Sequence, residues 1–343
     1  THWNDYVHTG IWVVAVILVG YGIVRWNAAS EDPADEADAA PRMFGDSIVD
    51  ARTQVDPAIG CARSTARTTA ERRPPALSAG RMVDTAAMSG RVTRVSIAPV
   101  KSLGLSHPET VELTPSGVVG DRRFWMITDE GRLVNGKLCS ELMQIRSTWD
   151  EPAGHLSMRF PDGVELAGTI ELGDPVEAQL YGEPHPSRRV IGPWQDALVR
   201  FAGFPLTLLW SERGAVDRGA DRGGWVSIVS RASLERLGDE VGEQPVDGRR
   251  FRMLFEIDGV GPHEEDEWIG DRVRIGGAVV RPLGDVGRCV VTKCDPDTGT
   301  SDLDTLGALA RYRRDGQTEP LPFGVYGEVV EPGRVAVGDA VGV

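Results

Sequence analysis

The stretch 156–166, LSMRFPDGVEL, decides the fold class that this sequence predicts. Its apolar residues Leu156, Met158 and Phe160 alternate with polar ones, and after the turn sequence Pro-Asp-Gly a second alternating segment begins. Alternation on both sides of a short turn predicts a β-hairpin, because successive side chains of a strand point to opposite faces. Two further stretches show the same pattern: 124–134 and 272–280.

Helical spacing of apolar residues is confined to short segments. Three segments show it: Trp194/Leu198/Phe201, Leu234/Leu237 after Ser230, and Leu303/Leu306/Ala310 after Ser301. We expect Ser230 and Ser301 to cap the last two helices at their N-termini. Because strands do not alternate with long helices, the pattern disfavours a doubly wound parallel sheet and favours closed or half-closed barrels. The predicted fold class is mainly β (α+β), with two β-barrel-like domains and a few short helices.

Length and charge narrow the function classes. At about 150 residues per domain, 343 residues predict roughly two domains with sizeable cores. The chain carries 37 basic and 51 acidic residues, for a net charge of −14. A net negative charge repels a phosphate backbone, which a nucleic-acid-binding protein must neutralise over a broad surface. We therefore expect no nucleic-acid partner. The four cysteines are too few and too unevenly spaced for a disulfide framework, which predicts a reducing compartment.

An apolar segment near the N-terminus predicts a membrane anchor. Residues 11–24 carry no charge, and the segment extends over residues 6–26, close to the roughly 20 residues that a bilayer needs. Aromatic residues flank it, as in interfacial anchors, and no basic n-region of a signal peptide precedes it. We expect a single-pass transmembrane anchor within residues 1–30; the alternatives are a buried helix and a cleaved signal peptide. We expect the anchor to lie in the cell membrane. Arg25 follows the apolar segment, and because basic residues flanking a membrane span favour the cytoplasmic side, we expect the folded domains to face the cytoplasm.

Residues 31–88 lack sustained apolar periodicity. An acidic run within 31–38 precedes a stretch rich in Arg, Ala, Thr and Pro, a composition typical of a disordered linker. Beyond it we expect two folded domains, over residues 89–210 and 211–343.

Two motif-like stretches are weak. Gly131, Gly136 and Lys137 nearly form a phosphate-binding loop, but Leu138 stands where the magnesium-binding Ser or Thr is required. We therefore reject that motif and keep Lys137 as a candidate anion contact. Residues 263–267, HEEDE, suggest a metal cluster at first sight, but we interpret them as a solvated loop that leads into the following Trp.

Cys289 and Cys294 lie in residues 287–299, which we expect to form a strand closed by an Asp-Pro-Asp-Thr-Gly turn. Their odd separation on a strand would place the two thiols on opposite faces, where they cannot easily bind one metal together. Arg288 beside Cys289 favours the thiolate, the form that acts as a nucleophile or soft metal ligand. From the residues alone, an inert buried cysteine is the commoner outcome, and a functional thiolate is the alternative.

Several stretches agree in order and spacing with one protein family. They are 98–102 (APVKS), 120–125 (GDRRFW), 251–252 (FR), 264–268 (EEDEW), 288–292 (RCVVT), 295–299 (DPDTG), 303–306 (LDTL), 312–313 (YR), 323–326 (FGVY) and 337–339 (VGD). Through them the chain, from about Val92 to Val343, resembles MOSC-domain proteins that carry an N-terminal MOSC β-barrel, the architecture of the mitochondrial amidoxime reducing components. The resemblance implies an N-terminal MOSC β-barrel domain over 89–210 and a MOSC domain over 211–343.

The resemblance also implies a molybdenum cofactor site built around Cys289. In that family the Cys of the R-C-x-x-T stretch is the protein ligand to the molybdenum of a pterin cofactor, and this position falls on Cys289, which is therefore the candidate catalytic residue. Soft thiolate ligation agrees with the donor preference of such metals. The implied contacts to the pterin and its phosphate are basic or polar: Lys101, Ser102, Arg122, Arg123, Lys137, Arg252 and Arg288. For the Arg before Phe-Trp, Arg123 is the first choice, and Arg122 is the alternative if the register differs by one.

Three stretches depart from the family pattern. The family's F-R-P-N reads FRML at 251–254, and its T-A-R-Q reads NGKL at 135–138. Residues 222–225, RGGW, lack the family's side-chain donors and leave only backbone N–H groups of the glycines. We therefore expect the polar contacts to the pterin to be rearranged.

The function that the resemblance implies is a membrane-anchored molybdenum oxidoreductase that reduces N-hydroxylated compounds by two electrons. The sequence holds no haem-binding, flavin-binding or ferredoxin-type cysteine pattern, so a separate ferredoxin- or flavoprotein-type protein would donate the electrons. Two alternatives stay open: a carrier of sulfur or of the molybdenum cofactor that uses Cys289, and a non-catalytic accessory subunit of a membrane complex.

Overall fold

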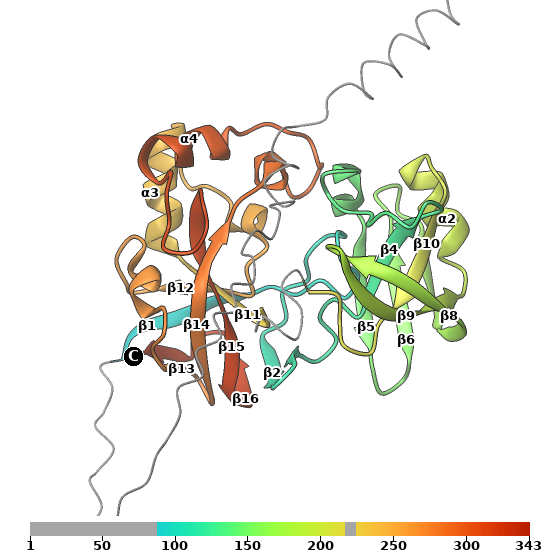
Figure 1. The fold of residues 1–343 in the computed structure, drawn as a ribbon, viewed down its shortest axis with the longest axis horizontal. Helices are drawn as coiled ribbons and strands as arrows, with labels where there is room; N and C mark the ends of the chain where they lie inside the picture. The colour runs from blue at the N-terminus through green and yellow to red at the C-terminus, as the bar shows by residue number, and fades with distance from the viewer. Residues whose placement is uncertain (1–87, 217–223) are drawn as a thin grey trace, which may run out of the picture. The chain divides into compact units, whose positions relative to one another are not determined.

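The computed structural model of this protein describes residues 88–216 and 224–343 (Figure 1). The predicted anchor over residues 6–26 and nearly all of the predicted linker over 31–88 lie outside the described residues. Within the described ranges, no helix combines the length and the apolar character that crossing a bilayer requires. This part of the chain is mainly β, as the alternation predicted, with short α-helices.

The strands are β1 (Met88–Val95), β2 (Thr110–Thr114), β3 (Gly117–Val118), β4 (Phe124–Thr128), β5 (Arg146–Asp150), β6 (His155–Arg159), β7 (Glu165–Thr169), β8 (Glu171–Leu180), β9 (Glu183–Ile191), β10 (Leu206–Trp210), β11 (Val226–Ser230), β12 (Phe255–Asp258), β13 (Val273–Ile275), β14 (Ala278–Gly287), β15 (Pro322–Glu331), β16 (Gly333–Ala336) and β17 (Ala340–Gly342). The α-helices are α2 (Gln195–Ala202), α3 (Arg231–Val241) and α4 (Thr305–Tyr312). The 3₁₀ turns are η2 (Ser140–Gln144), η4 (Gly248–Phe251), η5 (Glu264–Trp268) and η6 (Val290–Lys293).

One sheet closes into a barrel in the order β1-β12-β11-β15-β14-β13-β17. Its neighbouring strands are antiparallel, except that β11 and β12 are parallel. Apolar residues alternate into its interior, as in β13, where Val273 and Ile275 are buried on either side of exposed Arg274. These inward side chains form one apolar core, and burial of their surface at about 25 cal/mol per Å² favours the closed sheet.

The first described strand belongs to this barrel. β1 pairs with β12 through Val92 and Ile257, and with β17 through Met88 and Gly342. β2 pairs on one side with its sequence neighbour β3 and on the other side with the distant strand β16. Strand pairing therefore crosses the expected boundary between residues 210 and 211.

The remaining sheets of the described residues are open. They have the orders β4-β10-β9-β8, β5-β6-β7 and β16-β2-β3. The described residues thus hold one closed barrel and a set of open sheets where two barrel-like domains were expected, because nothing in short-range alternation fixes which strand edges meet. The predicted hairpins are present as β6–β7, as β13–β14 and as the return of β4 through a bridge between Ile127 and Leu133.

Two of the three predicted helices begin where expected. Ser230 caps α3, with its hydroxyl accepting a hydrogen bond from the Ser233 backbone N at 3.1 Å. The prediction for α4 is wrong by several residues. Its N-cap is Asp304, whose carboxylate accepts from Gly307 N, whereas Ser301 is held in a β-bridge with Cys294. Figure 1 shows α3 and α4 together, and they share an apolar cluster with the barrel end.

The acidic stretch 263–267 is not a solvated loop. Most of it forms η5, and Glu265 is fully buried, where its carboxylate accepts hydrogen bonds from Ser230 N at 3.1 Å and from the Ser233 hydroxyl at 2.8 Å. Burial raises the pKa of Glu265. In the described residues, no three His, Cys, Asp or Glu side chains are grouped so as to hold a metal ion.

Candidate functional site

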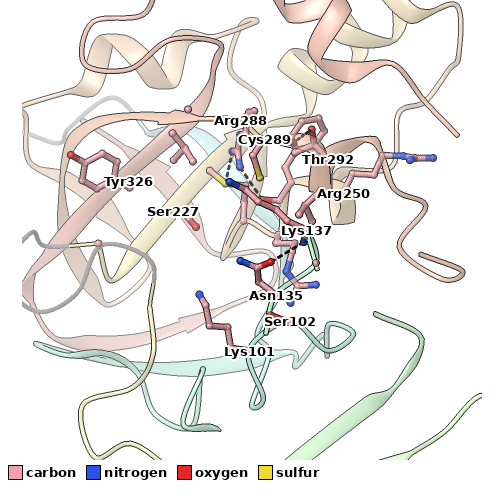
Figure 2. A pocket seen from close by; sticks show the side chains of 18 of the residues that line it. Lys101, Ser102, Asn135, Lys137, Ser227, Arg250, Arg288, Cys289, Thr292 and Tyr326 are labelled. Carbon is pink, nitrogen blue, oxygen red and sulfur yellow. Dashed lines mark hydrogen bonds between the residues drawn. The ribbon is translucent and has the colours of Figure 1, made fainter. Parts of the chain in front are cut away.

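A pocket of about 210 Å³ collects basic side chains from both halves of the described chain. The basic residues that line it are Lys101, Arg122, Lys137, Arg250, Arg252 and Arg288. None of the described lining residues is acidic, although the whole chain has a net charge of −14. Figure 2 shows Lys101 reaching into the pocket from the side opposite Cys289. Such a lining favours an anionic ligand.

Cys289 lines this pocket with its side chain exposed. The prediction of a continuous strand is wrong here, because β14 ends at Gly287 and η6 follows with Cys289 as its N-cap. Cys294, just after η6, is buried, and burial raises the pKa of its thiol. Burial also raises the pKa of the Cys139 thiol to about 11. Among the cysteines in the described ranges, Cys289 is therefore the one that a ligand can reach.

Arg288 holds the backbone around Cys289. Its Nε donates to the carbonyl of Phe323 at 2.9 Å and its Nη1 donates to the carbonyl of Phe251 at 3.1 Å. The guanidinium also lies 5.3 Å from the centre of the Phe251 ring. These contacts tie the loop that carries Cys289 to η4 and β15. Arg288 therefore acts on the site mainly by positioning it.

Lys101 comes from a loop that is fixed to β4. Its backbone N donates to the carbonyl of Phe124 at 2.7 Å. The side chain is buried, and Nζ lies 5.3 Å from the centre of the Tyr181 ring. Beside it, the Ser102 hydroxyl donates to the carbonyl of Val134 at 3.2 Å. Ser102 thus holds the loop in place, and Lys101 contributes a positive charge to the pocket.

The two arginines of the GDRRFW stretch, Arg122 and Arg123, point to different surroundings. Arg122 lines the pocket, and its Nη2 donates to the carbonyl of Arg252 at 3.5 Å. Arg123 is absent from the described lining; it donates to Glu151 Oε1 at 2.6 Å, and its guanidinium lies 5.4 Å from the Trp210 ring. The backbone explains the difference, since φ is 50° at Arg122 and regular alternation breaks there. Of the two candidates, Arg122 therefore lies at the pocket, and Arg123, the first choice, does not line it in the described residues.

Two arginines, one within η4 and one directly after it, also differ in role. Arg252 follows η4, and its Nη2 donates to the carbonyl of Leu103 at 2.8 Å. Arg250 is 4% exposed, and its guanidinium forms a two-point ion pair with Asp302 at 2.6 and 2.9 Å. Figure 2 shows the Arg250 side chain directed away from Lys101. Arg250 therefore forms part of the pocket wall, and its positive charge is balanced by Asp302, which does not line the pocket.

Lys137 lies in a tight turn. Asn135 Oδ1 accepts hydrogen bonds from the backbone N of Lys137 at 3.0 Å and of Leu138 at 3.2 Å. A Cβ at Gly136 would lie 3.1 Å from the methyl groups of Val291, so glycine lets this turn approach η6 closely. The NGKL stretch thus forms a turn that brings a lysine to the pocket.

Backbone strain is concentrated at this pocket. Of the non-glycine residues with positive φ in the described ranges, four line it: Ser102 (75°), Arg122 (50°), Tyr181 (52°) and Arg252 (54°). This conformation costs on the order of 1–3 kcal/mol for a residue with a Cβ. A cluster of such residues is typical of a site whose geometry is fixed before its ligand binds.

Sequence analysis did not propose several of the pocket-lining residues as site residues. They include Asn135, Met143, Tyr181, Ser227, Arg250 and Tyr326. Asn135 and Tyr326 lie in stretches that were compared with the family, and Tyr181 precedes a Gly at a hairpin turn where Asn-Gly is usual. For the other three, only the folded chain shows that they face the same space.

The donor set fits a molybdenum pterin cofactor. Every predicted site residue except Arg123 lines this one pocket: Lys101, Ser102, Arg122, Lys137, Arg252, Arg288 and Cys289. An exposed thiol is a suitable soft ligand, and ammonium and guanidinium groups are suitable partners for a phosphate.

Comparison with known proteins places these features in context. Residues 219–342 match the MOSC domain, and residues 89–183 match the MOSC N-terminal beta barrel domain. Mitochondrial amidoxime-reducing component 1 of Homo sapiens is 35% identical over 281 residues, 74% of this chain and 82% of that protein. Molybdenum cofactor sulfurase of Anopheles gambiae is 26% identical over 268 residues, 69% of this chain and 34% of that protein. The crystal structure of the YuaD protein from Bacillus subtilis aligns with 74% of this chain and 93% of its own, with 13% identity and a TM-score of 0.35.

Proposed function

Because this chain belongs to the family of MOSC-domain proteins that includes the amidoxime-reducing components, we propose that it is a molybdenum-cofactor-dependent reductase of N-hydroxylated compounds. In the proposed reaction the N–O bond of the substrate breaks. The substrate takes up two electrons and two protons and leaves as the N–H compound and water. An electron-donor protein of the ferredoxin or flavoprotein type supplies the electrons.

One observation carries this proposal: the exposed thiol of Cys289 shares a pocket with basic side chains and with no acidic residue of the described lining. When bound, a molybdenum pterin cofactor would supply the two-electron chemistry that no amino-acid side chain provides. Cys289 would be the protein ligand to its metal. Lys101, Arg122, Lys137 and Arg252 would bind the pterin and its phosphate.

The other residues of the pocket prepare this arrangement. Arg288 ties the segment that carries Cys289 to η4 and β15 through its bonds to the Phe251 and Phe323 carbonyls. The positive φ values at Ser102, Arg122 and Arg252 hold the binding groups in one geometry without the ligand. Binding then loses less conformational freedom, which is how preorganised sites gain affinity.

We also propose that residues 6–26 anchor the protein in the cell membrane, with the pocket on the cytoplasmic side. The support is the uncharged run with aromatic flanks and the single Arg that follows it.

Metal analysis tests the proposed function. The purified protein should contain molybdenum and pterin, Cys289→Ala should lose the molybdenum, and Cys294→Ala should keep it. Cys294 is the matched control because it is five residues away and buried. Equal molybdenum content in Cys289→Ala would contradict the assignment.

A sulfur or cofactor carrier is the second candidate, supported by the same exposed Cys289 and by the similarity to a molybdenum cofactor sulfurase. The two functions differ in stoichiometry. With reduced viologen and an amidoxime, a reductase forms many products per molybdenum, and Cys289→Ala abolishes them. A carrier gives at most one equivalent and holds cyanide-releasable sulfur on Cys289. If neither activity occurs, the accessory-subunit function stands.

A further inference from the structure

We propose that Asn135 is a recognition residue of the pocket, whose side-chain amide nitrogen donates a hydrogen bond to an acceptor atom of the bound cofactor. This inference rests on the proposed function, because it names a group that contacts the molybdenum pterin cofactor. Two observations carry it: the orientation in which the Asn135 amide is held, and the place of its turn against the segment that carries Cys289.

The amide of Asn135 is held in one orientation. Its Oδ1 accepts hydrogen bonds from two backbone N–H groups, that of Lys137 at 3.0 Å and that of Leu138 at 3.2 Å. An amide oxygen has two lone pairs, so both are occupied, and an amide nitrogen could not accept these bonds. The nitrogen Nδ2 therefore points away from the turn. Figure 2 shows it directed toward the space that the lining residues enclose.

The Nδ2 group keeps its two N–H donors for a ligand. Within residues 88–216 and 224–343, the Asn135 side chain forms hydrogen bonds through its oxygen, and Nδ2 donates to no protein group. The side chain is half-buried and lines the pocket. A ligand that enters the pocket displaces the water around this nitrogen, and a donor left without an acceptor lowers affinity. The ligand therefore has to supply an acceptor atom at this place.

The turn also fixes where this donor lies. The backbone carbonyl of Asn135 accepts from Cys139 N at 3.0 Å, which closes the main chain of the turn. A Cβ at Gly136 would lie 3.1 Å from the methyl groups of Val291, so the turn lies directly against η6. Val291 is two residues beyond Cys289. The donor is therefore held beside the segment that carries the proposed metal ligand.

A fixed neutral donor recognises the position of an acceptor rather than the charge of a ligand. The basic side chains of the pocket attract anions in general, whereas the Asn135 amide stabilises a ligand that places an acceptor atom at one point. In the proposed cofactor the available acceptors are the phosphate oxygens and the oxygen and nitrogen atoms of the pterin ring. One such neutral hydrogen bond is worth about threefold to tenfold in affinity.

Asn135→Asp separates recognition from formation of the turn. Aspartate keeps an oxygen for the Lys137 and Leu138 N–H groups and favours the same kind of turn, so the protein should unfold at the wild-type temperature. It replaces the donor by an oxygen that only accepts, and it adds a negative charge. Asn135→Ser keeps a turn-forming hydroxyl and removes the amide donor without adding charge. Leu138→Asp is the matched control, because Leu138 is exposed in the same turn and lies outside the described lining.

The measured quantity is the rate at which the purified protein loses its pterin after dilution, followed by fluorescence of the oxidised pterin. Asn135→Ser should lose pterin about threefold to tenfold faster than the wild type, and Asn135→Asp faster still. Leu138→Asp should change this rate by less than about twofold, because its charge is exposed and screened. Wild-type retention of pterin in Asn135→Asp would overturn the inference, since the residue would then serve the turn alone. Equal losses in Asn135→Asp and Leu138→Asp would also overturn it, since charge would explain both.

NMR separates this inference from the proposed reaction. The sequence contains three asparagines, at positions 4, 27 and 135, so nitrogen-15 labelling of asparagine side chains gives few signals, and Asn135→Ser identifies that of Asn135. Inorganic phosphate and 6-hydroxymethylpterin are added separately to the full chain produced without cofactor. A saturable shift of the Asn135 Nδ2 signal supports the inference even if the protein reduces no amidoxime, and the probe that causes it identifies the acceptor. No shift with either probe overturns the inference.

Discussion

The backbone carbonyl of Cys289 accepts two hydrogen bonds from Thr292, one from its backbone N at 3.1 Å and one from its hydroxyl at 3.0 Å. The Thr292 hydroxyl has given its hydrogen to this carbonyl, so it accepts from the hydroxyl of Thr305, 2.8 Å away, at the start of α4. One buried side chain, that of Thr292, thus connects Cys289 to a helix of the barrel end.

Thr292→Val should weaken both the fold and the cofactor site. The substitution keeps the volume but leaves the Thr305 hydroxyl without this partner, which costs about 1–3 kcal/mol of unfolding free energy. Urea denaturation measures this loss, and metal analysis should show less molybdenum per protein. Thr292→Ser retains the hydroxyl and should retain the molybdenum. Equal molybdenum in both variants would show that this contact does not position Cys289.

Arg122→Ala and Arg123→Ala should have opposite consequences. Arg122 lines the pocket, so its removal should lower the pterin and molybdenum content of the purified protein. Arg123 contacts Glu151 and Trp210 instead, so its removal should leave the cofactor in place and lower stability by about 1 kcal/mol. Cofactor analysis and thermal unfolding of the two variants check this, and cofactor loss on removing Arg123 would refute the choice between them.

His263 should make the fold less stable in mild acid. Burial, followed by the nearby Arg313 and Arg236 charges, lowers the pKa of His263 to about 3. Below the ordinary pKa of about 6.5 the unfolded chain binds a proton here that the folded chain does not, so stability falls with pH until about pH 3. The expected slope is about 1 kcal/mol per pH unit between pH 6 and 4. His263→Asn, which suits the local φ of 61°, should flatten the profile.

The control for this prediction lies in the same cluster. Burial raises the pKa values of Glu265 and Asp266, and such groups stabilise the fold as pH falls. Both carboxyls are present in the wild type and in His263→Asn, so the difference between the two profiles isolates the histidine. Denaturant unfolding at several pH values measures it, and parallel profiles would refute the assignment.

Removing residues 1–30 should release the protein from the membrane. The uncharged segment supplies the apolar surface that a bilayer takes up, so the full chain should remain in the membrane fraction after a high-salt wash. The shortened protein should be recovered in the supernatant with its molybdenum. A full chain that is recovered in the supernatant without detergent would contradict the anchor.

Local sequence patterns predicted the hairpins because turn residues and alternation act over a few positions. The turn at 161–163 and the Ser230 cap are such cases. Local patterns could not predict closure of the barrel. Its closing strands pair Met88 with Gly342, which are separated by nearly the whole described chain, and no local pattern indicates such a contact. The 3₁₀ turn after Cys289 was likewise hidden, because its β-branched residues resemble a strand.

Some residues of the candidate site were predicted and others were missed, again because contacts between distant parts of the chain leave no local pattern. The family resemblance supplied the positions of Lys101, Arg252 and Cys289, and the structure brings them to one pocket. It favoured Arg123 over Arg122, whereas a backbone with φ of 50° at Arg122 brings that residue to the pocket. It gave no sign of Tyr181, whose place depends on a long hairpin that ends at the pocket.

The pairing of β1 with β17 has a consequence for biosynthesis. As the chain emerges from the ribosome, β1 leaves the exit tunnel long before residues 340–342 are translated, so the barrel cannot close during most of translation. The open sheet edges of the nascent chain then need protection, and contacts of such long sequence separation form slowly. Under the proposed function, a cofactor held by Lys101 and Cys289 would be inserted only after both barrel edges have been synthesised.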